Sequence, residues 1–142
     1  MIATASVVHD VRQSRARALC AVGGAAAAAI AWAIEVPLTG IKLGIRFGGA
    51  HPQTVAAAQV IGAALAAGLI GWLLLAVLER RAPSPRVTWT GIALLVLAAS
   101  LALPLAAATT TSAAIGLIVL HLVVGAAVIP GMASTVRSRS RA

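Results

Sequence analysis

"AAIGLIVLHLVVGAAVIPGMA", residues 113–133, is a run of 21 residues in which His121 carries the one titratable side chain. About 20 apolar residues in a helix span the roughly 30 Å hydrocarbon layer of a bilayer. The backbone polar groups of such a run must be paired within the run itself, because lipid offers them no partner, and a helix does this. The stretch therefore predicts a transmembrane helix.

Three further apolar runs of similar length precede it, at residues 18–38, 55–78 and 87–107. Across the 142 residues, 61% are hydrophobic and 10% are charged, whereas soluble domains average about 25% charged residues. We predict a single-domain, all-α membrane protein: a four-helix transmembrane bundle with tails at residues 1–16 and 134–142. A cleaved signal peptide is the alternative for the first run, but its length and Trp32 favour a transmembrane helix.

The positions of Lys and Arg predict the orientation of the bundle, because cytoplasmic connections are enriched in these residues. With four spans, both tails and the second connection lie on one side and hold nine Arg, against Lys42 and Arg46 on the other. We expect a multi-pass protein of the cell membrane with both termini cytoplasmic. The charges lie between apolar runs rather than on one folded face, which argues against a nucleic-acid partner.

The connection between the first two runs carries a strand pattern. In "IKLGIRF", residues 41–47, apolar residues alternate with Lys, Gly and Arg, and Gly48-Gly49 follows as a turn signal. This pattern predicts a small extracytoplasmic β-hairpin, or an extended cap, between helices 1 and 2. An irregular interfacial loop is the alternative.

Small residues provide for contact between helices, because lipid removes the hydrophobic drive for helix association. Ala63, Ala67 and Gly71 follow one another at a spacing of four. They are expected to pack inside the bundle, although the same surface would suit a homo-oligomer. Trp72 and Trp89 flank the second connection and are expected to anchor the helices at the membrane interface.

One polar residue in each predicted helix falls in the extracytoplasmic half of the membrane: Glu35, Gln59, Ser100 and His121. His121 is the deepest, at about 12 Å from the outer end of its helix. Two interpretations are open. In the first, Glu35 reaches toward the outer lipid headgroups, Gln59 bonds a neighbouring helix, and a neutral His121 bonds a backbone carbonyl or Ser100. In the second, the four form a binding pocket in which Glu35 and His121 are partners that exchange a proton or hold a polar ligand.

Other site chemistries lack the residues they require. A bundle haem needs a second axial ligand beside His121, and zinc needs more nitrogen or sulfur ligands than this set supplies. The single Cys20 excludes an intramolecular disulfide, and there is no visible nucleophile–base pair for catalysis. We therefore expect no catalytic residues, no metal and no cofactor.

Four phrases make the sequence similar to a known family: "RFGGAHPQTV" (46–55), "GLIGWLLLAVLER" (68–80), "TWTGIALLVLAASLALPLAAATTT" (88–111) and "HLVVGAAVIPG" (121–131). They resemble a family of small four-helix integral membrane proteins from actinobacteria that is known only as a domain of unknown function. The resemblance implies the four-span layout over most of the chain. It places Gln53, Trp89, His121, Pro130 and Gly131 in recurring phrases, and it implies no activity.

The expected function is that of a non-enzymatic accessory or interaction subunit of the cell envelope. Its partners would be the lipid bilayer and either further copies of the chain or another membrane protein. A small transporter or proton-coupled carrier that uses Glu35, Gln59, Ser100 and His121 is the alternative.

Overall fold

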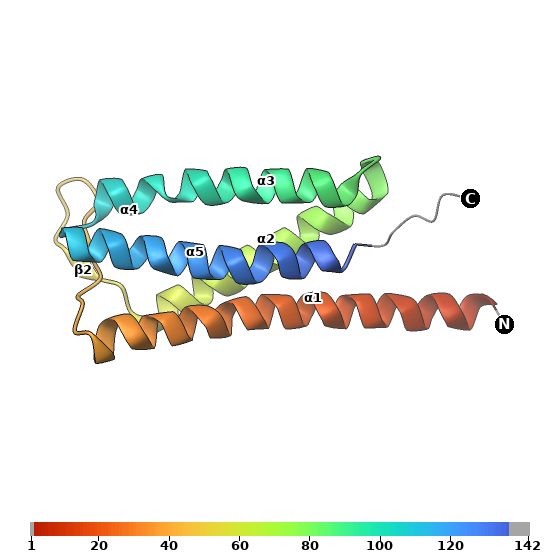
Figure 1. Ribbon diagram of the computed structural model, residues 1–142, viewed down its shortest axis with the longest axis horizontal. Coiled ribbons are helices and arrows are strands. Elements are labelled where there is room, and N and C mark those ends of the chain that lie inside the picture. Colours follow the sequence, from red (N-terminus) through yellow and green to blue (C-terminus); the bar gives the residue numbers. More distant parts are fainter. Residues whose placement is uncertain (1, 137–142) are drawn as a thin grey trace.

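A computed structural model describes the backbone of residues 2–136 and the side chains of residues 11–136, so residues 137–142 of the predicted C-terminal tail lie outside the described part. The elements in chain order are α1 (Ile2–Ala33), η1 (Ile34–Leu38), β1 (Gly44–Ile45), β2 (Gln53–Thr54), α2 (Ala57–Arg81), α3 (Pro85–Ser100), α4 (Ala102–Ala107) and α5 (Thr111–Ser134). Figure 1 shows α1, α5 and α3 side by side, with α2 crossing behind them.

Four stretches of the described chain are long and apolar enough to cross a membrane: Val11–Leu38, Ala57–Arg81, Pro85–Ala107 and Thr111–Ser134. The prediction of an all-α membrane protein with four transmembrane helices is confirmed. The first helix is longer than expected, because α1 begins at Ile2 and takes in most of the predicted tail, residues 1–16. Figure 1 shows this N-terminal part of α1 extending beyond the other helices.

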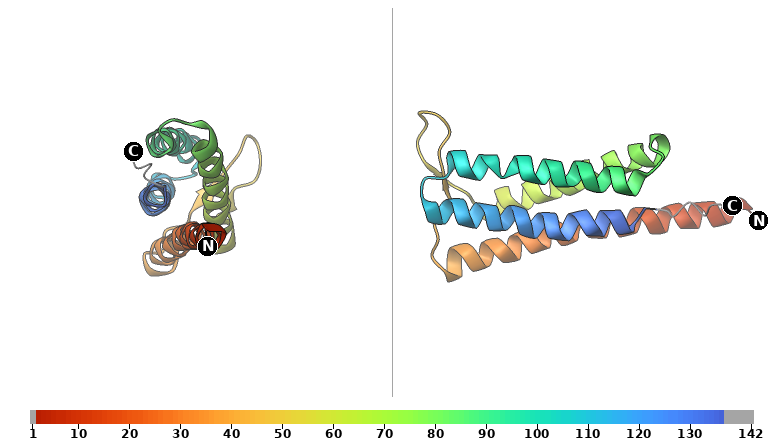
Figure 2. Two further views of the ribbon diagram at one scale, coloured as in Figure 1. Left: turned by 90° about the vertical axis from the view of Figure 1, so that its right-hand side faces the viewer. Right: turned by 45° about the horizontal axis from the view of Figure 1, so that its top comes forward.

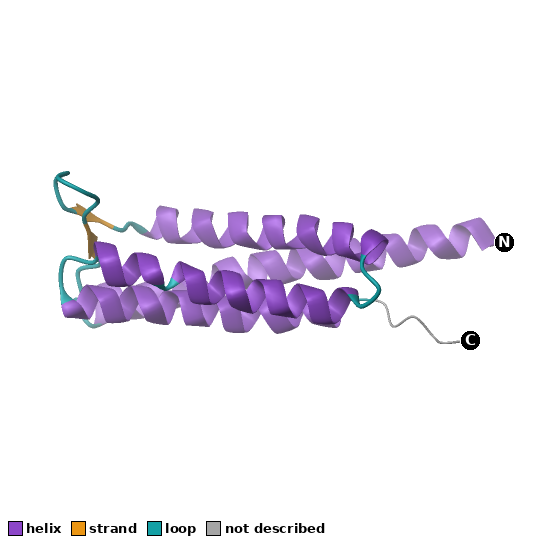
Figure 3. Cartoon of the chain, turned by 90° about the horizontal axis from the view of Figure 1, so that it is seen from above, coloured by secondary structure: helices purple, strands orange, loops and turns teal. Residues whose placement is uncertain are grey.

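The predicted β-hairpin is also confirmed, with β1 and β2 paired antiparallel through Gly44–Thr54 and Ile45–Gln53. Ile45 forms a second bridge to Ala108, in the connection between α4 and α5. The hairpin therefore fastens two connections of the chain together. We call this end of the bundle, with η1, the hairpin and the start of α5, the cap end (Figure 3). The opposite end, with the α2–α3 connection, is the terminal end.

Two prolines interrupt the helices near the cap end. A proline lacks the N–H that would bond the carbonyl four residues earlier, and its ring crowds that carbonyl. α1 gives way to the π-helical turn η1 after Ala33, four residues before Pro37. α3 likewise ends at Ser100, four residues before Pro104, so the predicted span 87–107 is a helix broken at Leu101.

Small residues bring the helix backbones into close contact in the bundle core. The buried cluster at mid-bundle consists of Ala25, Ala28 and Ala64. One turn further along α2, a methyl group on Gly68 would lie 2.9 Å from the Cα atom of Ala21. Because Gly68 has no side chain, α1 and α2 can approach closely at this point. Close packing of this kind is expected in a membrane, where no hydrophobic effect drives helices together.

Trp89 was predicted to anchor its helix at the membrane interface, but its side chain is buried inside the bundle. Its ring packs on Gly71 of α2, where a Cβ atom would come within 2.8 Å of Cη2. It lies in the buried cluster of the terminal end with Leu75 and Met132. Trp89 therefore joins α3 to α2 and α5, and Gly71 leaves the room for it.

We expect Gly68→Ala to lower the stability of the protein by about 1–3 kcal/mol, because the new methyl group meets the backbone of α1, which cannot yield as a side chain does. Gly91→Ala on α3 is the matched control, since nothing lies within 4 Å of its Cβ position. That variant should be unchanged, or more stable by up to about 1 kcal/mol, as Ala favours the helix. Thermal unfolding in detergent distinguishes the two, and equal effects would contradict this packing.

Candidate functional site

The four predicted site residues all lie toward the cap end or at mid-bundle, on different elements. Glu35 is in η1, Gln59 in the first turn of α2, Ser100 at the end of α3 and His121 halfway along α5. Among the described residues, no hydrogen bond or ion pair joins any two of them. The predicted partnership of Glu35 and His121 is thus not formed in this structure.

Three of the four residues are hydrogen-bonded within their own helices. The Ser100 hydroxyl donates to the Leu97 carbonyl at 2.7 Å, and the Gln59 side-chain oxygen accepts from the Ala56 N–H at 2.8 Å. His121 Nδ1 lies 2.6 Å from the Leu117 carbonyl oxygen. A carbonyl only accepts, so Nδ1 carries the proton and Nε2 remains as the other polar atom of the ring. The His121 bond to a backbone carbonyl is the one that the packing interpretation predicted. Gln59, by contrast, bonds the N–H at the start of its own helix and not a neighbouring helix.

Glu35 differs from the other three in having no partner. Its side chain is buried, with 8% exposed, and neither carboxyl oxygen has a hydrogen-bond partner among the described residues. The carboxyl group lies against Gly116 of α5, where a Cβ atom would come 3.1 Å from Oε2 and 2.7 Å from Leu43 Cδ2. The Glu35 carboxyl group and the Leu43 side chain thus both lie against Gly116.

The irregular turn η1 explains why Glu35 points inward. The Ile41 N–H donates to the Glu35 carbonyl at 3.1 Å, and the Thr39 hydroxyl donates to the same oxygen. The residues that follow η1 are therefore held to the backbone of Glu35 rather than to a continuing helix. Single-turn π-helical insertions of this kind are frequent at functional sites.

A cavity of about 500 Å³ lies at the cap end, beside the hairpin. Seven of its eleven lining residues have polar side chains: Thr39, Lys42, Gln53, Thr54, Thr109, Thr110 and Ser112, together with Gly40, Ile41, Gly44 and Pro52. None of the four predicted site residues lines it. The alternating pattern of the hairpin predicted one side of this cavity. The other side is formed by the α4–α5 connection, which is distant in sequence and which the pattern does not predict.

A second polar cluster, at the terminal end, was missed by reasoning from the sequence. Arg17 of α1 is 4% exposed and its Nη2 lies 2.6 Å from Glu79 Oε1 of α2. Gln13 donates to the same carboxylate oxygen and to the Thr135 carbonyl, and Arg17 Nε donates to the Thr135 hydroxyl. The cluster ties α1, α2 and the end of α5 together, which is a structural role.

The described side chains contain no group of three or more His, Cys, Asp and Glu residues placed to hold a metal ion. Comparison with known proteins adds a family and no activity. The model of a family of unknown function, DUF6069, matches residues 9–138. No curated protein and no solved structure gives a significant match to the chain.

Glu35 and Glu79 allow a matched pair of substitutions with opposite expected signs. Glu35→Met removes a buried carboxyl group that has no partner, so we expect the stability to rise by about 1–3 kcal/mol. Glu79→Met leaves Arg17 buried without its counter-ion, so we expect a loss of roughly 2–4 kcal/mol. Thermal unfolding of both variants in one lipid or detergent tests this, and a loss at both positions would show that Glu35 is bound to a stabilising group.

Proposed function

The chain belongs to the family of unknown function DUF6069, and we propose that this member is a non-enzymatic interaction subunit that assembles in the membrane through α2. The observation that carries the proposal is an exposed face of small residues on the half of α2 nearer the cap end. Gln59, Gly62, Ala63 and Ala66 lie on this face, which we call the α2 small-residue face, and all four are exposed.

The structure separates the small residues of α2 into two groups with different surroundings. Gly68 and Gly71 are buried against Ala21 and Trp89, so they serve packing within the bundle. A Cβ atom on Gly62 would instead meet nothing within 4 Å. Small residues let the backbones of two membrane helices approach closely, which is the usual basis of their association. Intramolecular packing thus leaves the α2 small-residue face without an internal role.

The lipid-facing side of α3 has the opposite character. Large side chains are exposed along α3 and α4: Leu94, Leu95, Val96, Leu103 and Leu105. Such a surface packs well against lipid acyl chains, whereas the α2 small-residue face offers them fewer van der Waals contacts. Gln59 adds a side-chain amide whose N–H groups can donate across a helix–helix contact.

The partner we propose is a second copy of the chain, with α2 packed on α2 about a two-fold axis. A two-fold contact uses the same patch on both subunits, so the patch must complement itself. Two faces of Gly and Ala meet this requirement, because neither presents a bulky side chain to the other. Carriage of a substrate by Glu35, Gln59, Ser100 and His121 is the weaker alternative, since that function needs a shared pocket and none of the four lines the cap cavity.

Disulfide trapping in native membranes tests the α2 contact. In a Cys20→Ala background, we expect Ala66→Cys to form a cross-linked dimer on oxidation, and Gly62→Leu to reduce the yield several-fold by holding the helices apart. Val96→Cys is the matched control, since it is exposed on α3 near mid-helix. No dimer at residue 66, or equal dimer at residue 96, would contradict the proposal. If residue 66 formed a cross-link to a different protein instead, the partner at this face would be that protein and not a second copy of the chain.

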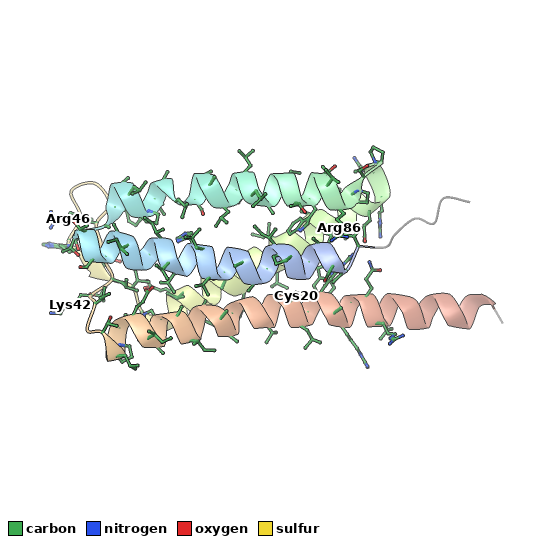
Figure 4. All side chains as sticks on the ribbon, viewed as in Figure 1. Cys20, Lys42, Arg46 and Arg86 are labelled. Atoms are coloured by element: carbon green, nitrogen blue, oxygen red, sulfur yellow. The ribbon has the colours of Figure 1, made fainter. Side chains whose placement is uncertain are left out.

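The location we propose is the cell membrane, with the terminal end in the cytoplasm. Lys42 and Arg46 lie at the cap end and Arg86 at the terminal end (Figure 4), together with Arg80 and Arg81. This distribution supports cytoplasmic termini through the enrichment of positive charge on that side. A green fluorescent protein fused after residue 142 should fluoresce, and an alkaline phosphatase fused there should be inactive. The reverse pattern would show the opposite orientation.

A further inference from the structure

Among the described side chains, Glu35 is a buried ionisable group with no hydrogen-bond or ion-pair partner. Both of its carboxyl oxygens are buried, and Oε2 lies near Gly116 and Leu43 at the cap end. Transfer of an ionised carboxylate from water to such surroundings costs several kcal/mol unless a charge or hydrogen bond compensates it. Ionisable groups inside a membrane protein are for this reason candidates for a functional role.

The charged and titratable groups on the elements packed around Glu35 do not compensate it. The hairpin carries Lys42, Arg46 and His51, all exposed, and α5 carries His121, which is bonded to the Leu117 carbonyl. None of them bonds a carboxyl oxygen of Glu35. A proton is a ligand that this buried carboxyl group can bind without any further room.

Leu43 lies near this carboxyl group and is flanked in the chain by residues of the cap cavity. Lys42 and Gly44, on either side of it in the chain, both line the cavity. The Leu43 side chain is fully buried and points the other way, toward Gly116 and the carboxyl group. The backbone at Leu43 is fixed by the hairpin, since its carbonyl accepts the Val55 N–H at 2.8 Å. The Leu43 side chain thus lies near the buried acid, while its chain neighbours line the cavity.

We propose that Glu35 is a proton-binding site reached from the cap cavity, and that Leu43 is the hydrophobic gate between them. When Leu43 moves aside, hydronium in the cavity transfers its proton to a carboxylate oxygen of Glu35. An O–H bond forms there and a water molecule is left behind. When Leu43 returns, it closes the neutral carboxyl group off from water. This site is independent of the α2 contact, so either proposal can fail without the other.

Carbodiimide labelling of the whole protein in lipid nanodiscs tests the gate. A water-soluble carbodiimide with glycine ethyl ester converts accessible protonated carboxyl groups to amides, which peptide mass spectrometry quantifies. We expect slow labelling of Glu35 in the unmodified protein and about tenfold faster labelling in Leu43→Ala, because truncation opens a path from the cavity. Leu43→Met should restore slow labelling. Glu79, at the terminal end, provides an internal reference whose rate should not change.

Leu120→Ala is the matched control, since Leu120 belongs to the same buried cluster and lies on α5 instead of the hairpin. Its labelling rate at Glu35 should stay within about twofold of the unmodified protein if loosening alone does not open the path. Equal acceleration by Leu120→Ala and Leu43→Ala would overturn the gate. Unchanged labelling in Leu43→Ala, with faster reaction by a lipid-soluble carbodiimide, would also overturn it and place access on the lipid side.

The proton itself is tested by infrared spectroscopy. We expect a C=O stretching band of a protonated carboxyl group that is absent from Glu35→Gln. In Leu43→Ala this band should respond to pH more rapidly than in the unmodified protein. Absence of the band at every pH at which the protein stays folded would overturn the proton site, whatever the labelling shows.

Discussion

Close approach of helix backbones is the constraint on which this structure depends. Lipid does not drive apolar helices together, so contact must come from packing at short range. The alanine cluster at mid-bundle and Gly68 against Ala21 bring α1 and α2 together there. The oblique path of α2 follows from these contacts and from Gly71, which admits Trp89 of α3 (Figures 1 and 2). A larger side chain at either glycine would move α2 and, with it, the hairpin that precedes it.

The two ends of the bundle treat their acidic residues in opposite ways. At the terminal end, Glu79 is bound by Arg17 and Gln13, and the cluster reaches α5 through Thr135. At the cap end, Glu35 is more deeply buried than Glu79 but has no such partner among the described residues. The polar contacts of the terminal end therefore hold α1, α2 and the end of α5 together. The cap end combines an interrupted helix, a cavity of about 500 Å³ and an acid without a partner among the described residues. These three features are the basis of the proton-binding proposal.

The sequence predicts the fold well because the length and hydropathy of a run show directly whether it can cross a lipid bilayer. Each span exceeds the length needed to cross a bilayer, and the period-two pattern at residues 41–47 marks the hairpin. The site is harder to predict, because the neighbours of a helical side chain depend on how the helices pack together. Trp89 was expected at the interface and is buried, and the Arg17–Glu79 pair joins residues 62 positions apart. Glu35 was one of the four polar residues predicted for the extracytoplasmic half of the membrane, but its lack of partners is visible only with the neighbouring elements in place.

The double pairing of Ile45, to Gln53 and to Ala108, has a consequence for the covalent continuity of the chain. It joins the connection that follows α1 to the connection that precedes α5, while α2 and α3 are linked at the far end by the short segment after Arg81. The first half of the chain and the second half are thus held by non-covalent contacts along the whole bundle and at the cap. A protein cut in the α2–α3 connection would retain every one of those contacts. Two fragments synthesised separately on either side of this connection could therefore associate and form the complete bundle.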